Sequence, residues 1–194
     1  MVLVVLVSGA PASGKSTLGA ALARRLGAAL LDQDVITGPL TEVVAGLVGT
    51  DDLDDPALRD RTRAARYESV LATAVANLGV GRPVVAVGPF TRERSDPAAW
   101  AATRDRLRAA GGRPALVWLR VEPDELLRRM RARGAGRDRG KLADPARLAV
   151  AAEPPRVEHI ELDGTRPTEW LADRLAARLA AGGARVGNGP WPTP

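Results

Sequence analysis

The sequence contains no cysteine and only one histidine, His159. The absence of thiols excludes disulfide bonds, thiolate catalysis and metal sites built from thiolates. A single imidazole likewise excludes a metal centre that needs several histidines.

Long hydrophobic runs are also absent. No run of about 18 uncharged apolar residues occurs, so the sequence predicts no membrane-spanning helix. The N-terminal apolar stretch stops at Gly9 and has neither a basic leader nor a small-residue cleavage site. We therefore expect a soluble, unprocessed, cytoplasmic chain, and 194 residues suit one domain with one core.

Lysine and aromatic residues are scarce. Only two of the 28 basic residues are lysines, Lys15 and Lys141, and the aromatic residues are one Tyr, one Phe and four Trp. The net charge of +5 could attract a polyanion. The abundance of Ala and Arg is, however, typical of a coding bias, and few aromatic rings are available to stack on bases. The composition therefore argues against a nucleic-acid partner, and it makes both lysines candidates for positions that need a flexible point charge.

Five continuous apolar runs, separated by helical patterns, predict buried parallel strands. Asp55-Pro56, Asp96-Pro97 and Glu122-Pro123 indicate helix starts, because an acidic cap precedes a proline, and we expect Thr168 to cap the last helix. The alternation of strands and helices predicts an α/β fold with a five-stranded, doubly wound parallel sheet flanked by helices. The expected strands are Leu3–Val7, Ala28–Leu31, Val84–Val87, Ala115–Val121 and Glu158–Leu162.

The stretch "GAPASGKST", residues 9–17, follows the first predicted strand and opens a predicted helix. Gly9, four further residues and then Gly14-Lys15-Ser16 match the phosphate-binding loop pattern. Glycines allow the backbone to wrap around an anion, Lys15 reaches the β- and γ-phosphates, and the Ser16 hydroxyl binds Mg²⁺. We therefore expect a nucleoside triphosphate to contact Gly9, Ala12, Ser13, Gly14, Lys15, Ser16 and Thr17.

Two acids in "ALLDQD" decide between a kinase and a hydrolase. A GTPase is excluded, because lysine occurs only at positions 15 and 141 and neither forms an Asn-Lys-x-Asp motif. The run Val84–Val87 also ends without the acid typical of ATPase motors. Asp32 and Asp34 lie two residues apart, so in an extended strand both carboxylates project from one face toward the ligand crevice. A carboxylate there can accept the proton of an attacking hydroxyl. The alternative is that one or both cap the following turn.

The stretches "GAPASGKST", "LLDQD", "GPFTRE" and "RARGAGRDRGKL", in this order and spacing, resemble P-loop kinases that phosphorylate small-molecule hydroxyls. Chloramphenicol phosphotransferase, adenylylsulfate kinase and zeta toxins are such kinases, and the nearest likeness is to uncharacterised bacterial proteins labelled AAA-family ATPases. The resemblance covers about residues 1–180 and implies the nucleoside- and shikimate-kinase-like P-loop fold, with ATP and Mg²⁺ as cofactors. It implies Asp34 as the base and Asp32 as a magnesium ligand or base. Gly88 departs from the resembling proteins, which often have Asp there.

The resemblance also implies roles outside the loop and the two acids. It implies an arginine-rich lid over about 131–144, in which Arg133 and Arg137 contact the ATP phosphates, whereas Arg128, Arg129 and Arg131 are expected to be solvated charges. Arg92 is expected on the acceptor side. The adenine pocket is expected to include Thr165, Arg166 and Pro167, and a Gly- and Pro-rich tail over 181–194 is expected to lie outside the core.

A stripe of Arg59, Arg63, Arg66 and Val70 on one predicted helix either lines an acceptor pocket or faces water, and we favour water for most of it. The sequence as a whole favours an ATP- and Mg²⁺-dependent kinase that transfers the γ-phosphate to a hydroxyl of a small molecule such as a sugar, a nucleoside or an antibiotic. Two alternatives stay open: a 5′-hydroxyl polynucleotide kinase, and a non-catalytic ATP-binding regulator or ATPase switch.

Overall fold

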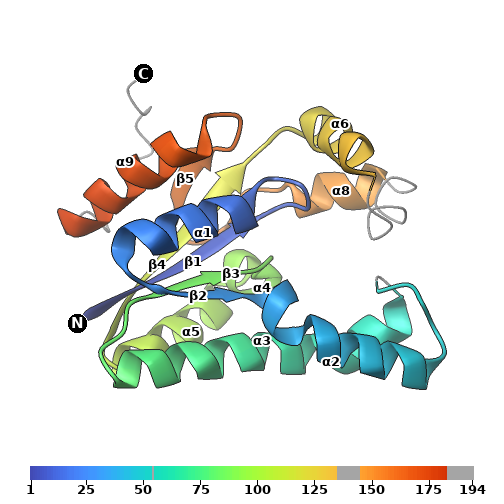
Figure 1. Ribbon diagram of the computed structural model, residues 1–194, viewed down its shortest axis with the longest axis horizontal. Helices are drawn as coiled ribbons and strands as arrows, with labels where there is room; N and C mark the ends of the chain where they lie inside the picture. Colours follow the sequence, from blue (N-terminus) through green and yellow to red (C-terminus); the bar gives the residue numbers. More distant parts are fainter. Residues whose placement is uncertain (54, 135–144, 183–194) are drawn as a thin grey trace.

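A computed structural model of the chain describes residues 1–53, 55–134 and 145–182 (Figure 1). Five parallel strands form one sheet in the order β2-β3-β1-β4-β5. The fold therefore confirms the predicted α/β class and each of the five predicted strands, although most strand ends shift by one to three residues. The strands are β1 (Val2–Gly9), β2 (Ala29–Asp32), β3 (Val84–Val87), β4 (Gly112–Arg120) and β5 (Ile160–Asp163).

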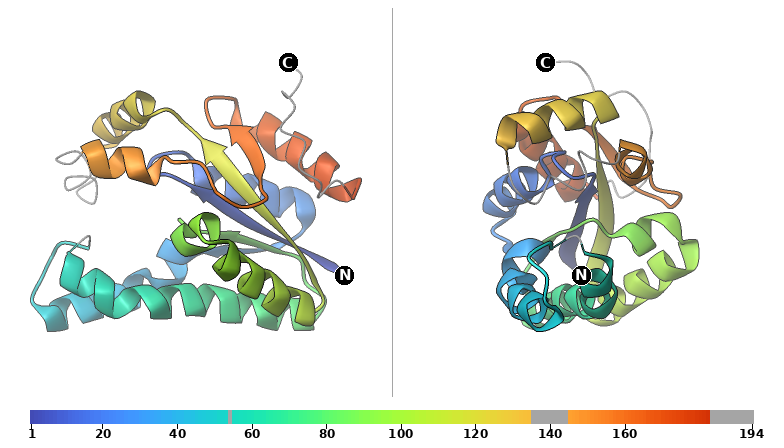
Figure 2. Two further views of the ribbon diagram at one scale, coloured as in Figure 1. Left: turned by 180° about the vertical axis from the view of Figure 1, so that it is seen from behind. Right: turned by 90° about the vertical axis from the view of Figure 1, so that its right-hand side faces the viewer.

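Helices cover both faces of the sheet, as the end-on view in Figure 2 shows. On one face, α1 (Lys15–Leu26) and α9 (Thr168–Ala180) bury a core with Val5, Val117 and Leu175 at its centre. On the other face, α3 (Pro56–Gly79) and α5 (Pro97–Ala109) bury a second core. Because side chains alternate along each strand, neighbouring residues of β1 enter opposite cores, which explains why the apolar runs are continuous.

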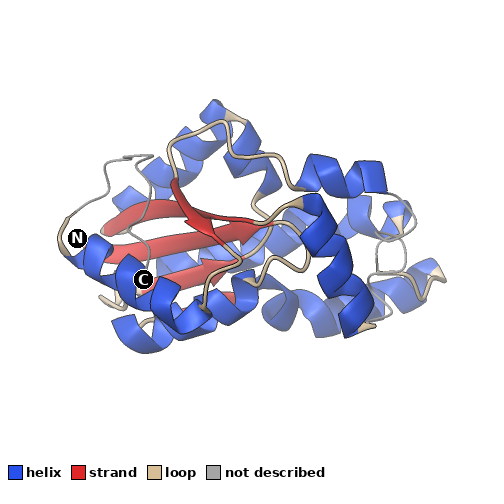
Figure 3. Ribbon diagram, turned by 90° about the horizontal axis from the view of Figure 1, so that it is seen from above, coloured by secondary structure: helices blue, strands red, loops and turns tan. Residues whose placement is uncertain are grey.

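The remaining helices gather near the carboxyl ends of the strands (Figures 1 and 3). They are α2 (Gln33–Val48), α4 (Thr91–Ser95), α6 (Pro123–Arg133) and α8 (Pro145–Ala151). A small third core, which includes Ala10, Leu126 and Leu148, packs α6 and α8 against the loop after β1. The carboxyl edge of the sheet is thus enclosed by α2 and α3 on one side and by α6 and α8 on the other.

The helix starts confirm two predicted caps and correct two others. Asp55 and Asp96 each accept hydrogen bonds from the first helical turn. Glu122 makes no side-chain cap, and Thr168 is the first residue of α9, whose N-cap is Pro167. A threonine inside the first turn cannot accept from the amides that a capping side chain reaches. Within the described residues, no helix combines the length and hydrophobicity needed to cross a membrane.

Candidate active site

The phosphate-binding loop joins β1 to α1 and contains the left-handed backbone turns that such a loop needs. Ala12 has a φ of 63°, and Gly14, the N-cap of α1, has a φ of 97°. A Cβ at Gly9 would lie 2.5 Å from Ser13 Oγ and 3.2 Å from the carbonyl oxygen of Leu119. Only glycine fits there, so the loop can wind tightly with the amides of the first turn of α1 at its mouth.

Several polar side chains of this loop are placed to meet an anion. Ser13 Oγ is buried and has no hydrogen-bond partner within the described residues. Lys15 Nζ donates to the carbonyl of Ala10 at 3.4 Å, which folds the ammonium group back over the loop. The side chains of Ser16 and Thr17 are exposed at the start of α1. This set of hydroxyls and one ammonium group fits a nucleotide phosphate chain.

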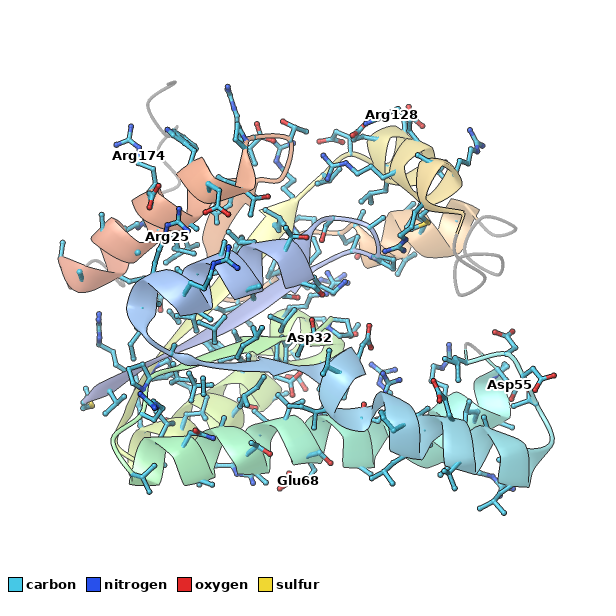
Figure 4. The ribbon with its side chains drawn as sticks, viewed as in Figure 1. Arg25, Asp32, Asp55, Glu68, Arg128 and Arg174 are labelled. Atoms are coloured by element: carbon cyan, nitrogen blue, oxygen red, sulfur yellow. The ribbon has the colours of Figure 1, made fainter. Side chains whose placement is uncertain are left out.

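The two acids after β2 occupy different structural positions. β2 ends at Asp32, whose Oδ1 accepts a hydrogen bond from the amide of Asp34 at 3.0 Å and caps α2 (Figure 4). Asp34 therefore lies in the first turn of α2, and the prediction that both carboxylates project from one face of an extended strand is wrong. The capping alternative holds for Asp32, which is buried. Asp34 lines the same cleft as the phosphate-binding loop.

Arg66 of α3 fixes the orientation of Asp34. Its Nη2 donates to Asp34 Oδ1 at 2.9 Å, and its Nε donates to Thr37 Oγ1 at 3.0 Å. The Asp34 side chain is still 62% exposed, so a ligand can reach it. Because the guanidinium group of Arg66 bonds to both Asp34 and Thr37, it orients the Asp34 carboxylate and leaves that carboxylate accessible.

The cleft has a volume of about 600 Å³, within the range of small-molecule sites. Its walls come from the phosphate-binding loop, the start of α2, one side of α3, the β3–α4 loop, the end of α6 and α8. Arg59, Arg63 and Arg66 all line it, which favours the acceptor-pocket alternative for this stripe, although Arg63 is also exposed to water as expected. The remaining member of that stripe, Val70, is fully buried in the second core.

On α4, the structure brings Arg94 rather than Arg92 to the cleft. Arg92 is exposed and does not line the cleft, so its acceptor role stays a prediction that this geometry does not favour. Arg94 is buried, with its guanidinium 4.8 Å above the ring of Trp118, and it donates to the carbonyls of Ala151 and Glu153. Burial lowers the pKa of Arg94. Its partners are backbone groups almost sixty residues away, so no sequence pattern could indicate this contact.

On α6, the expectation of solvated charges is wrong for Arg129. Its Nη1 donates to the carbonyl of Ser13 at 3.2 Å, its Nη2 to the carbonyl of Gly164 at 3.0 Å, and its Nε to Glu125 at 2.7 Å. Arg128 is exposed as expected and also binds Glu125, and together Arg128 and Arg129 lower the pKa of Glu125 to about 2. Arg129 therefore links the phosphate-binding loop to the loop after β5.

The other predicted nucleotide contacts are placed only in part. Arg133, at the end of α6, lines the cleft, whereas Arg137 lies outside the described residues, as does most of the expected lid. Thr165 Oγ1 donates to Asp163 Oδ1 at 2.7 Å within the turn after β5. The turn 165–167 does not line the cleft, so its adenine role stays a prediction.

The donor set around the loop suits a magnesium ion only in part. No group of three or more acidic or histidine side chains within the described part of the chain could bind a metal by itself. Ser16, on the cleft wall, could supply one hydroxyl ligand, with the nucleotide phosphates and water completing the shell. Such a site fits Mg²⁺ that arrives with its nucleotide.

Residues 4–154 match the family model described as an AAA domain. The chain belongs to this family. The matched region begins in β1 and ends just beyond α8, so it includes the phosphate-binding loop, both acids and α3. The described residues that line the cleft, from Gly9 to Ala151, all lie within the matched region.

Proteins similar to this chain include a shikimate kinase, a putative kinase and an APS kinase. A shikimate kinase of Corynebacterium glutamicum is 29% identical over 143 residues, which are 74% of this chain and 72% of that protein. A putative kinase from Chloroflexus aurantiacus has a TM-score of 0.66 at 22% identity, over 93% of this chain and 97% of that one. The APS kinase of Mycobacterium tuberculosis, solved with AMPPNP and APS, has a TM-score of 0.60 at 19% identity, over 92% and 97%. These similarities confirm the P-loop kinase fold that the sequence predicted.

Proposed function

We propose that the protein is an ATP- and Mg²⁺-dependent kinase that transfers the γ-phosphate to a hydroxyl of a small molecule. The observation that carries this proposal is that Asp34 and the phosphate-binding loop line one cleft. The ion pair with Arg66 holds the carboxylate in place while leaving it exposed. The cleft volume supports a small-molecule acceptor over a polynucleotide.

The transfer follows from these positions. The acceptor oxygen attacks the γ-phosphorus while Asp34 accepts the hydroxyl proton, the bond to the β–γ bridging oxygen breaks, and ADP leaves with that electron pair. Lys15 and Arg133 neutralise charge on the transferred group, and Arg137 would join them from the predicted lid. Mg²⁺, held by Ser16 and the phosphates with Asp32 as a further candidate ligand, would supply additional charge neutralisation.

The remaining contacts belong to the same proposal. Thr165, Arg166 and Pro167 would border the adenine, and Arg92 would contact the acceptor. A non-catalytic regulator has less support, because such a protein needs no oriented carboxylate beside its phosphate-binding loop.

The test measures ADP release from ATP with a panel of sugars, nucleosides, hydroxy acids and hydroxylated antibiotics. At least one acceptor should raise ADP release, and Asp34→Asn should lower that acceptor-dependent rate by about a hundredfold or more, which is the usual size of a general-base contribution. Asp105→Asn is the matched control, because Asp105 is exposed on α5 and does not line the cleft. Equal ADP release with and without every acceptor, unchanged in Asp34→Asn, would overturn the proposal.

A further inference from the structure

The charges that line the cleft are strongly unbalanced. Within the described residues the lining contains one acid, Asp34, and six basic side chains: Lys15, Arg59, Arg63, Arg66, Arg94 and Arg133. The segment 135–144, which lies outside that description, contains three basic and two acidic residues, so its composition does not offset the excess. A cleft with this balance attracts anions.

Four of these six basic side chains already have a role or a binding partner. Lys15 contacts the phosphate-binding loop and Arg133 ends the helix that leads to the predicted lid, so both belong to the nucleotide. Arg66 binds Asp34, and Arg94 donates to backbone carbonyls. Arg59 and Arg63 are left over, one helical turn apart on α3.

Within the described residues, Arg59 has one long contact with a carboxylate and Arg63 has none. Arg59 Nε is buried without a hydrogen-bond partner, and the carboxylate of Asp60 lies 3.9 Å from it. Arg63 forms no hydrogen bond or salt bridge there, and its electrostatic interactions run to Tyr67 and to Glu93, a buried residue of α4. Two neighbouring guanidinium groups with open donors form a fork that suits an oxyanion.

We propose that the acceptor carries an oxyanion, a carboxylate or a phosphate, which Arg59 and Arg63 bind while its hydroxyl lies at Asp34. This inference rests on the proposed kinase function and narrows its acceptor class. With a rise of 1.5 Å per residue, Arg63 and Arg59 lie about 4.5 and 10 Å along α3 from Arg66, which holds Asp34. The anionic group is therefore separated from the reacting hydroxyl by several bonds. With a neutral acceptor, the open donors of both guanidinium groups would bond only to water.

A binding experiment tests the oxyanion site directly. The full chain is saturated with AMPPNP and Mg²⁺, so that the phosphate-binding loop is filled, and is titrated with inorganic phosphate and with acetate. Arg59→Gln and Arg63→Gln, made singly, should each weaken binding by about tenfold to a hundredfold, because each removes charge-assisted hydrogen bonds. Arg61→Gln is the control, since Arg61 lies on the opposite side of α3 and does not line the cleft. Equal anion affinity in the wild type, both variants and the control overturns the inference.

A turnover experiment uses matched pairs of acceptors: gluconate with glucose, and ribose 5-phosphate with ribose. The anion of a pair should be phosphorylated with a kcat/KM at least about tenfold above its neutral counterpart, and Arg63→Gln should remove that advantage. Faster turnover of gluconate than of glucose indicates a carboxylate site, and faster turnover of ribose 5-phosphate than of ribose indicates a phosphate site. Equal or better turnover of the neutral partner overturns the inference, and if none of the four is phosphorylated the binding result decides it.

The two proposals fail in different ways. If the kinase function is wrong, no acceptor raises ADP release and Asp34→Asn changes nothing, while anion binding can still depend on Arg59 and Arg63. If only the oxyanion inference is wrong, acceptor-dependent ADP release persists and does not depend on Arg59 or Arg63. Thermal melting of each variant verifies that it is folded.

Discussion

Replacement of Arg129 by methionine should loosen the phosphate-binding loop without touching its sequence. Arg129 donates to the carbonyls of Ser13 and Gly164, and these bonds connect the loop to α6 and to the turn after β5. Methionine keeps most of the aliphatic stem and its packing but removes the donors. The expected effects are a modest loss of stability and a weaker affinity for nucleotide.

The magnitudes follow from the contacts. Hydrogen bonds to a charged group contribute about 1.5–3 kcal/mol each when they are buried. The Arg129 side chain is 26% exposed and the two bonds are 3.0 and 3.2 Å long, so water replaces part of each. We expect the free energy of unfolding to fall by about 1–2 kcal/mol, which lowers Tm by about 2–8 °C for a chain of this size. If about 1 kcal/mol of loop ordering must then come from binding, the Kd for AMPPNP rises about fivefold.

The assay is thermal melting together with calorimetric titration of AMPPNP. Arg128→Met is the matched control, because Arg128 shares the carboxylate of Glu125 but is 70% exposed and has no contact with either loop in the described structure. The control should keep Tm within about 1 °C and Kd within twofold, as is usual for an exposed ion pair. Identical values for Arg129→Met and Arg128→Met would refute the reasoning, since the bonds to the two loops would then contribute nothing.

Three further predictions concern the loop, a buried acid and a cap. Gly9→Ala forces its Cβ against Ser13 Oγ and should weaken AMPPNP binding about tenfold. Gly19→Ala is the control: its Cβ would meet Val87 at 2.3 Å, so it should lower only the stability of the fold, by about 1–3 kcal/mol. Similar Kd values for the two variants would argue against a special role of the loop. Burial raises the pKa of Glu93 above 4.5, so the folded chain binds that proton more tightly than the unfolded chain and loses stability as pH rises above 4.5. The Tm advantage of Glu93→Gln should therefore grow between pH 4.5 and 7.5, and an advantage that does not change with pH would contradict this account. Asp32→Ala should cost about 1 kcal/mol through the lost cap of α2 while Asp32→Asn keeps Tm nearly unchanged, and equal losses would show that charge rather than capping matters.

The sequence predicted the sheet well because strands buried on both faces leave a local signal. Each of the five apolar runs became a strand, and the loop after β1 lies where its glycines indicated. The ends of the strands are determined instead by pairing with the neighbouring strands. β4 begins at Gly112, before its predicted start at Ala115, because Val2 to Val4 of β1 pair with residues 112–114. No local sequence pattern indicates the register in which two strands pair.

The site was harder to predict because its contacts join distant segments. An arginine stripe on a helix is typical of a solvated face, and only the packing of α2 beside α3 turns that stripe toward the cleft (Figure 1). Val70 is an apolar residue in the same stripe, and its presence in the sequence indicates that this face of α3 is not wholly exposed. Arg94 and Arg129 bind backbone carbonyls, which every residue has, so neither contact could be identified from residue types.

The strand order explains why the cleft lies where it does. β1 and β3 are neighbours, yet the chain leaves them toward opposite faces: α1 follows β1 into the first core, and α5 follows β3 into the second. Connections that diverge in this way leave a crevice at the carboxyl ends of the two strands. The buried Ser8 Oγ links the ends of these two strands by donating to the carbonyl of Pro89, which lines the cleft, at 2.8 Å. Because β2 lies beyond β3, the helix that follows β2 begins beside this crevice, and Asp34 in its first turn lines the same cleft as the loop after β1. The position of Asp34 is therefore a consequence of topology, and Arg66 of α3 binds its carboxylate within the same cleft.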